Sequence, residues 1–262
     1  MVLKNGTAAG IALALTLLLA YGCREQKLAS TPVAADIGTS TPAPSPTATR
    51  AQPSLARLEF TPTSAAPGES ITLRGSGWPA GVSLVANLYE TSGIGGPPGA
   101  PLGTTFQTDA NGTFSVQGTV PRTLFGAGSR GNLNVIPGDY TIVVSQSPEV
   151  HVTAQFVVGA PSHGALLWGE AFFDINGNGQ QDAGDIPWTV DVSIQGSAPS
   201  SPTAHAITDG RGRYVVSPLK PGLYRLSTQA EYQSATWTAN TSALAENGRV
   251  TWADLLLRLS SK

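Results

Sequence analysis

The feature that most constrains the fold is the way in which glycine and proline divide the chain into short segments. Of the 262 residues, 30 are glycine and 20 are proline. Apolar residues in residues 70–74 and 82–89 recur with a period of two on either side of residues 75–81, a glycine- and proline-rich segment that no helix would tolerate. Because such alternation predicts half-buried strands, and no segment has a convincing amphipathic helical pattern, we expect an all-β fold built as β-sandwiches.

Further alternating segments continue the pattern through the first half of the chain. They are residues 104–108, 113–120, 139–145 and 150–158. Between the first two stands Asp109-Ala110-Asn111-Gly112, where the aspartate can begin a turn and the glycine can adopt φ > 0. This spacing predicts a β-hairpin over residues 104–120.

The N-terminus has the composition of an export signal. Lys4 supplies a short positive region, and residues 8–20 are mostly apolar but too few to span a membrane as a helix. They lead to Cys23, the only cysteine in the sequence. Residues 19–23, Leu-Ala-Tyr-Gly-Cys, resemble a bacterial lipobox, which implies cleavage after Gly22 and a lipid on Cys23. The alternative is an ordinary secretory signal with an incidental cysteine. Either signal exports the mature protein, and the lipid would hold it in the cell envelope, facing outside the cytoplasm.

The segment after the signal is a predicted tether. Residues 29–54 are mostly Thr, Pro, Ala and Ser, a composition that cannot bury a core. The globular part then opens with Phe60-Thr61-Pro62 and residues 67–78, which together resemble the start of immunoglobulin-like repeats of the IPT/TIG type in bacterial surface proteins.

Two short patterns occur twice along the chain. Residues 108–116 are echoed by residues 208–216, and residues 137–140 by residues 221–224. Two related sandwiches in tandem would produce these echoes, and so would independent use of the same turn residues. The expected organisation is a signal peptide (1–22), a lipidated Cys23 with a flexible tether (23–54), an immunoglobulin-like sandwich (55–160) and a second sandwich (161–262).

Residues 174–185 carry the most specific chemistry in the sequence. Oxygen-bearing side chains stand at positions 1, 3, 5, 9 and 12 of this twelve-residue segment, and a glycine stands at position 6, as in calcium-binding loops. The candidate ligands, with position 7 included, are Asp174, Asn176, Asn178, Gln180, Asp182 and Asp185. The alternative is an Asx- and glycine-rich turn that holds no metal.

The residues around this loop exclude an EF-hand. Pro187 blocks a helix directly after the loop, and residues 188–194 alternate as a strand does. Residues 166–173 upstream are short and aromatic, which also favours a strand. The loop is therefore expected to join two strands.

The second half of the chain resembles the B-type repeats of Gram-positive serine-aspartate adhesins, calcium-binding relatives of the Cna-B domain. The matching residues are 169–185, 208–214 and 219–224. The resemblance implies a prealbumin-like β-sandwich at the cell surface, with a structural or adhesive role and no catalysis. Only three of the loop residues are carboxylates, which predicts weak calcium binding, about 10⁻⁴ to 10⁻³ M. The first strand has no lysine, so we expect no Lys–Asn isopeptide cross-link of the kind that some relatives carry.

Charge and motifs bear on the remaining function classes. A formal net charge of −2 provides no basic stripe for nucleic acid. The histidines are His151, His163 and His205, none of them in a nucleophile or zinc motif and all expected at the surface, so no enzyme is predicted; a glycosidase is the least implausible kind. We expect a monomer that contacts the membrane through its lipid and binds a surface protein or a polysaccharide.

Tryptophan provides the alternative function, a carbohydrate-binding module. Four of the five tryptophans lie in the second half: Trp168, Trp188, Trp237 and Trp252. Exposed aromatic rings stack on sugars. The alternation around Trp188 predicts a core position for it, whereas Trp237, between two threonines, is expected to be exposed.

Overall fold

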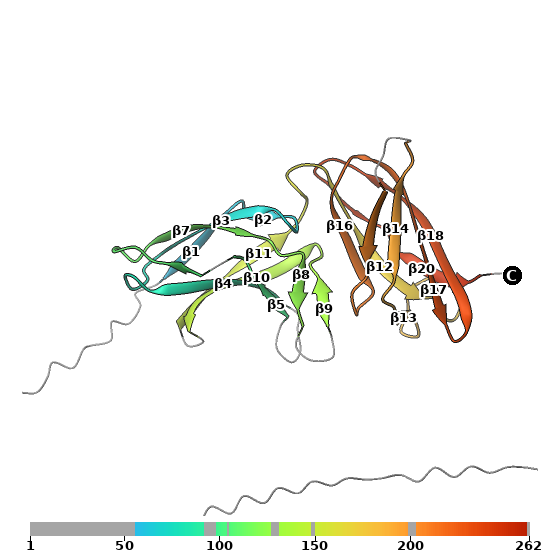
Figure 1. Ribbon diagram of the computed structural model, residues 1–262, viewed down its shortest axis with the longest axis horizontal. Coiled ribbons are helices and arrows are strands. Elements are labelled where there is room, and N and C mark those ends of the chain that lie inside the picture. Colours follow the sequence, from blue (N-terminus) through green and yellow to red (C-terminus); the bar gives the residue numbers. More distant parts are fainter. Residues whose placement is uncertain are drawn as a thin grey trace, which may run out of the picture. The chain divides into compact units, whose positions relative to one another are not determined.

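The computed structural model describes residues 56–91, 98–103, 105–126, 131–147, 150–198 and 203–260. Every regular element in these ranges is a β-strand (Figure 1), so the all-β prediction is confirmed. In the part of the chain that is described, no helix is long and apolar enough to cross a membrane. The predicted signal peptide, Cys23 and the tether lie outside these residues.

The N-terminal half consists of a three-stranded sheet, in the order β1-β3-β7, and an eight-stranded sheet, in the order β2-β11-β10-β4-β5-β8-β9 with β6 paired to β4. Its strands are β1 (Arg57–Thr61), β2 (Ser64–Ala65), β3 (Ser70–Ser76), β4 (Ser83–Glu90), β5 (Gly99–Pro101), β6 (Phe106–Gln107), β7 (Phe114–Thr119), β8 (Thr123–Phe125), β9 (Asn132–Asn134), β10 (Gly138–Ser147) and β11 (Val150–Val158). Ile71 and Leu73 of the smaller sheet join one buried cluster with Leu88 and Ile142 of the larger sheet. The strands predicted by alternation thus bury one face each.

The predicted hairpin over residues 104–120 is wrong, although its turn forms. Gly112 N–H donates to the carbonyl of Asp109, and Asp109 N–H donates to the carbonyl of Thr113. Beyond this turn the two strands diverge, since β6 pairs with β4 and β7 pairs with β3. The turn therefore links the two sheets of the sandwich.

The C-terminal half is arranged around β12, which has neighbours on both edges. Its strands are β12 (Ala165–Phe173), β13 (Ile186–Pro187), β14 (Asp191–Gly196), β15 (Thr203–Ile207), β16 (Arg213–Leu219), β17 (Gly222–Tyr232), β18 (Ala235–Ala245), β19 (Val250–Trp252) and β20 (Leu255–Leu259). β12 runs antiparallel to β13 and β16 and parallel to β19 and β20. A second buried cluster, separate from the first, includes Phe173, Tyr214, Leu226 and Leu255.

The sequence echoes correspond to equivalent turns. Asp109 Oδ1 accepts hydrogen bonds from the amides of residues 111 and 113, and Asp209 Oδ1 accepts them from the amides of residues 211 and 213. Gly112 and Gly212 both adopt a positive φ, 70° and 75°. Each turn joins two strands with different partners: β6 pairs with β4 and β7 with β3, while β15 pairs with β14 and β16 with β12.

The echoes also extend to bonds between residues far apart in sequence. Thr108 Oγ1 bonds Pro79 O and the amide of Val82, and Thr208 Oγ1 bonds Trp188 O and the amide of Val190. These partners are 18 to 29 residues away, so local turn chemistry alone does not account for the similarity. The two halves therefore share these long-range bonds as well as the turns.

Side chains of the two halves meet at Glu90, at the end of β4. Arg213 Nη1 and Arg211 Nη1 lie 3.0 Å and 2.9 Å from Glu90 Oε1, and Arg213 Nε lies 3.1 Å from Asp209 Oδ2. Burial alone would lower the pKa of Arg213, but the charges of Asp209 and Glu90 and the hydrogen bond to Glu90 raise it. Arg213 therefore stays charged although its side chain is only 7% exposed.

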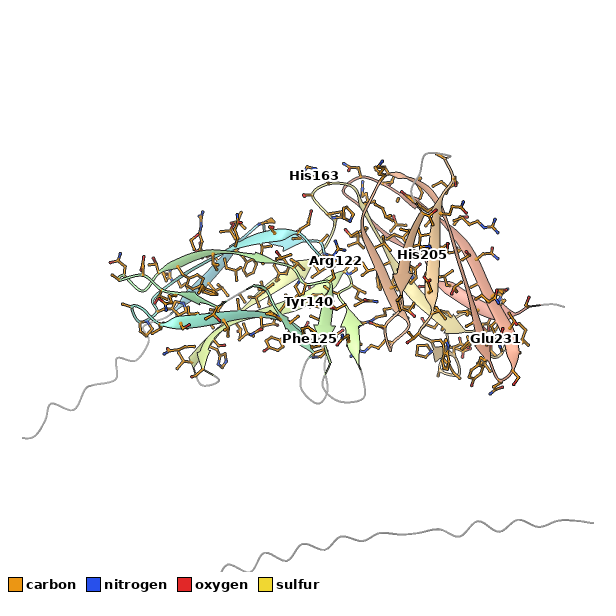
Figure 2. All side chains as sticks on the ribbon, viewed as in Figure 1. Arg122, Phe125, Tyr140, His163, His205 and Glu231 are labelled. Carbon is orange, nitrogen blue, oxygen red and sulfur yellow. The ribbon has the colours of Figure 1, made fainter. Side chains whose placement is uncertain are left out.

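Two further contacts lie at the same boundary. Arg122, labelled in Figure 2, donates from Nη1 to the carbonyl of Ser217 in β16. The amide of Asn134 in β9 donates to Asp209 Oδ2, and its side-chain amide donates to the carbonyls of Ile207 and Arg213. The boundary between the sandwiches is thus polar and hydrogen-bonded.

Candidate metal loop and exposed aromatic residues

The candidate calcium loop closes a pair of antiparallel strands. Phe172 pairs with Pro187 and Phe173 with Ile186, so β12 leads into residues 174–185 and β13 leaves them. The prediction that the loop joins two strands is confirmed. The predicted strand over residues 188–194 is shifted, since β14 begins at Asp191.

Aromatic packing fixes the point at which the loop begins. The ring of Phe173 contacts Tyr232, Trp237 and Trp188, with centroid distances of 4.7 Å, 5.1 Å and 5.4 Å. The amide of Asp174 then donates to the carbonyl of Leu257 in β20. Asp174 is therefore held in place by a packed core on one side and by a neighbouring strand on the other.

Asp174 itself is buried and only partly satisfied. Its Oδ2 accepts a hydrogen bond from the amide of Gly179, at position 6 of the loop, and lies 3.2 Å from Arg258 Nε. Its Oδ1 is buried and has no hydrogen-bond partner among the atoms that the structure describes. Gly179 has φ of 79°, and a Cβ there would lie 2.6 Å from Arg258 Nη2. The positive φ therefore favours glycine at position 6, whereas the exposed end of the Arg258 side chain could move away from a Cβ there.

The amides at positions 3 and 5 converge on the aspartate at position 9. Asn176 Nδ2 and Asn178 Nδ2 donate to Asp182 Oδ2, over 2.6 Å and 2.8 Å. The amide of Gly184 donates to Asp182 Oδ1. The bonds from Gly184, Asn176 and Asn178 lower the pKa of Asp182, so that its carboxylate is ionised well into the acidic range.

The remaining candidate ligands close the loop on itself. Asp185 Oδ1 accepts from the amide of Ile175 and Asp185 Oδ2 from the amide of Asp182. The amide of Gln180 donates to Asn178 Oδ1. The structure thus brings Asn176, Asn178 and Asp182 into one cluster, while Asp185 bonds to backbone amides and Asp174 bonds to one backbone amide and to Arg258.

In this closed form, no group of three or more His, Cys, Asp or Glu side chains in the described ranges is gathered closely enough to hold a metal ion. The donor set nevertheless fits calcium chemically, because it consists of carboxylate and amide oxygens only. The unpartnered oxygen of Asp174 is the atom that such an ion would satisfy. Arg258 contacts Asp174 but lies outside residues 174–185, so the loop pattern could not predict this contact.

Two expectations about the tryptophans are wrong. Trp237 is 8% exposed because its ring packs on Phe173, and the threonines on either side of it take the outward positions. Trp188, predicted to lie in the core, is 37% exposed. The most exposed tryptophan is Trp252, at 57%, and its ring lies 4.6 Å from that of Trp168.

His151 and His205 are exposed, as expected. His205, labelled in Figure 2, lies in β15, and its Nδ1 is 3.3 Å from Oδ1 of the exposed Asp191. His163 is exposed, as expected.

Comparisons with known proteins assign no family. No family model and no curated protein matches the chain. Similar solved structures include macromomycin, with 16% identity and a TM-score of 0.32 over 40% of this chain and 99% of that chain. The minor pilin GBS52 of Streptococcus agalactiae has 12% identity and a TM-score of 0.28 over 72% of this chain and 86% of that chain. The major pilin subunit BcpA of Bacillus cereus has 11% identity and a TM-score of 0.22 over 79% of this chain and 70% of that chain. Identities and TM-scores as low as these carry over no function.

Proposed function

We propose that the protein is a lipid-anchored, non-catalytic module of the cell surface, structural or adhesive in role, whose C-terminal sandwich is stabilised by calcium. The lipid anchor rests on the lipobox-like residues 19–23. The observation that carries the calcium site is the buried Oδ1 of Asp174, which no hydrogen bond satisfies in the described chain. A buried carboxylate oxygen without a partner destabilises the folded state. A cation in the loop would remove that penalty.

The loop residues have the chemistry to hold the ion. Asp174, Asp182 and Asp185 supply carboxylate oxygens, and Asn176, Asn178 and Gln180 supply amide or backbone oxygens. Asp182 now accepts two side-chain amide bonds, which calcium would replace. Calcium would bring a positive charge to the Asp182 carboxylate, which the neutral side chains of Asn176 and Asn178 do not.

Binding to the folded loop alone would stabilise the protein by mass action. With a dissociation constant of about 10⁻³ M and about 10 mM calcium, the free energy of unfolding rises by about 1.4 kcal/mol. For a chain of this size, that corresponds to a melting temperature higher by roughly 3–6 °C. The gain is modest, as suits a structural site where extracellular calcium is plentiful.

Thermal melting with calcium and with a chelator tests the proposal. The wild-type protein is expected to melt at a higher temperature in calcium, whereas Asp174→Asn abolishes the difference because the central ligand loses its charge. Asp139→Asn is the matched control, since Asp139 is an exposed aspartate of the N-terminal half, and it should respond as the wild type does. A wild-type melting temperature that does not change in millimolar calcium contradicts the site.

A further inference from the structure

The most exposed tryptophan of the described chain belongs to an aromatic pair on the outer face of β12 and β19. Trp168 and Trp252 stand opposite each other in the parallel register, and their ring planes are inclined at 44°. Trp168 is half-buried and Trp252 is exposed. The two strands can approach because residue 169 is glycine: a Cβ there would lie 2.0 Å from the carbonyl oxygen of Ala253.

Two carboxylates and one amide border this pair. Asp254 Oδ1 accepts hydrogen bonds from Trp252 Nε1 and from the amide of Glu170. Glu170 Oε2 accepts a hydrogen bond from Gln181 Nε2, which comes from the loop over residues 174–185. Each carboxylate is therefore oriented through one oxygen, and the structure describes no bond to the other oxygen, Asp254 Oδ2 or Glu170 Oε1.

This combination selects among ligand classes. An apolar protein surface placed on Trp252 would take Glu170 and Asp254 out of water without supplying donors, which is costly. An anionic ligand would be repelled by both carboxylates. A neutral sugar avoids both costs. The C–H face of a pyranose ring packs on an indole, and the hydroxyl groups of the sugar donate to carboxylate oxygens.

We propose that Trp252, supported by Trp168 and bordered by Glu170 and Asp254, forms a binding platform for neutral polysaccharide. The platform specifies the ligand class of the surface role proposed above. It does not require calcium in the loop, because the rings and both carboxylates lie on β12, on β19 and just after β19. Among the described hydrogen bonds, the one from Gln181 Nε2 to Glu170 Oε2 joins the platform to the loop.

Affinity electrophoresis and tryptophan fluorescence test the platform on the full-length protein. The probes are soluble β-glucan, mannan and xylan, with pull-down on cellulose and chitin for insoluble chains. We expect at least one probe to retard the protein and to change its tryptophan emission. Trp252→Ala should weaken that binding about tenfold or more, since truncation of a central aromatic contact removes most of its contribution.

Two variants keep the result interpretable if Trp252→Ala disturbs folding. Trp252→Phe retains a ring and should retain measurable binding, and Glu170→Gln should weaken binding without altering the melting temperature. Trp188→Ala is the matched control, because Trp188 is a partly exposed tryptophan in a different aromatic cluster and its loss should leave the affinity unchanged.

Two outcomes would overturn the platform. One is the absence of binding to every probe, in calcium and in chelator alike. The other is self-association of the wild type that Trp252→Ala abolishes, since the platform would then be a contact between copies of the chain. If the protein binds sugar but calcium does not change its melting temperature, the calcium site is contradicted and the platform is not.

Discussion

Replacement of Glu90 by glutamine changes a residue of the N-terminal sandwich that pairs with two arginines of the C-terminal sandwich. Glu90 has a side chain 10% exposed, between Arg213 at 7% and Arg211 at 34%. With Asp209, these residues form a set of two negative and two positive charges. Glutamine keeps the size of the side chain and an acceptor oxygen, so the substitution removes chiefly the charge.

The expected cost follows from what remains around Arg213. Removing one partner of a buried ion pair costs about 3–5 kcal/mol when the other charge is left unpaired. Arg213 keeps its bond to Asp209, and Arg211 is exposed enough to recover water, so we expect a smaller loss, about 2–3 kcal/mol of unfolding free energy. The melting temperature should fall by roughly 4–12 °C.

Denaturant unfolding followed by tryptophan fluorescence and circular dichroism measures this loss. The wild type should unfold with coincident transitions, because the ion pairs couple the two sandwiches. Glu90→Gln should separate the transitions of the two halves. The control is Glu59→Gln, an exposed glutamate of β1, which should cost less than about 0.5 kcal/mol. Equal stability of the two variants would refute the coupling.

Three further predictions concern the loop and the anchor. Arg258→Gln should strengthen calcium binding several-fold, measured by titration calorimetry, because the guanidinium bonded to Asp174 no longer competes with the ion; unchanged or weaker binding would contradict this. Because the folded pKa of Asp182 lies below its ordinary value of 3.8, its contribution to loop order is fully present above that value and is lost as pH falls through the lower, folded pKa. The side-chain amide resonances of Asn176 and Asn178 should shift in that acidic window, and resonances that shift only at higher pH would disagree. Cys23→Ser should move the protein from the membrane fraction to the soluble exported fraction, whereas an unaltered distribution would argue for the ordinary secretory signal.

The strands could be predicted well from the sequence because their signal is local. Alternation with a period of two and the surrounding turn residues predicted β3, β4, β10 and β11 to within a few residues. The choice of strand partner is not local, and here prediction failed: the turn at residues 109–112 forms as its residues indicate, yet β6 and β7 join different sheets. The two strands on either side of a well-formed turn can pair with each other or lie in different sheets. Only the packing of the sandwich decides between these two arrangements.

The exposure of the tryptophans could not be predicted from local sequence either. Alternation around Trp237 identified two faces of a strand but not which face would be covered, and the ring of Phe173 covers Trp237. Trp252 carried no distinguishing signal, since β19 is a three-residue strand with exposed positions at both ends. Whether an aromatic residue packs or faces water depends on which strand lies over it, a property of the tertiary structure.

The sequence by itself determined the all-β class, the turn at residues 109–112, and which oxygen-bearing side chains lie between Asp174 and Asp185, because each follows from the side chains present and their spacing. The tertiary structure decided that Asp174 is buried with one oxygen unpartnered, that Arg258 lies beside it, and that Glu90 joins Arg211 and Arg213. These contacts join residues 84, 121 and 123 positions apart. Spacing along the chain does not encode such pairs; they arise only when the sheets pack and water is removed from between them.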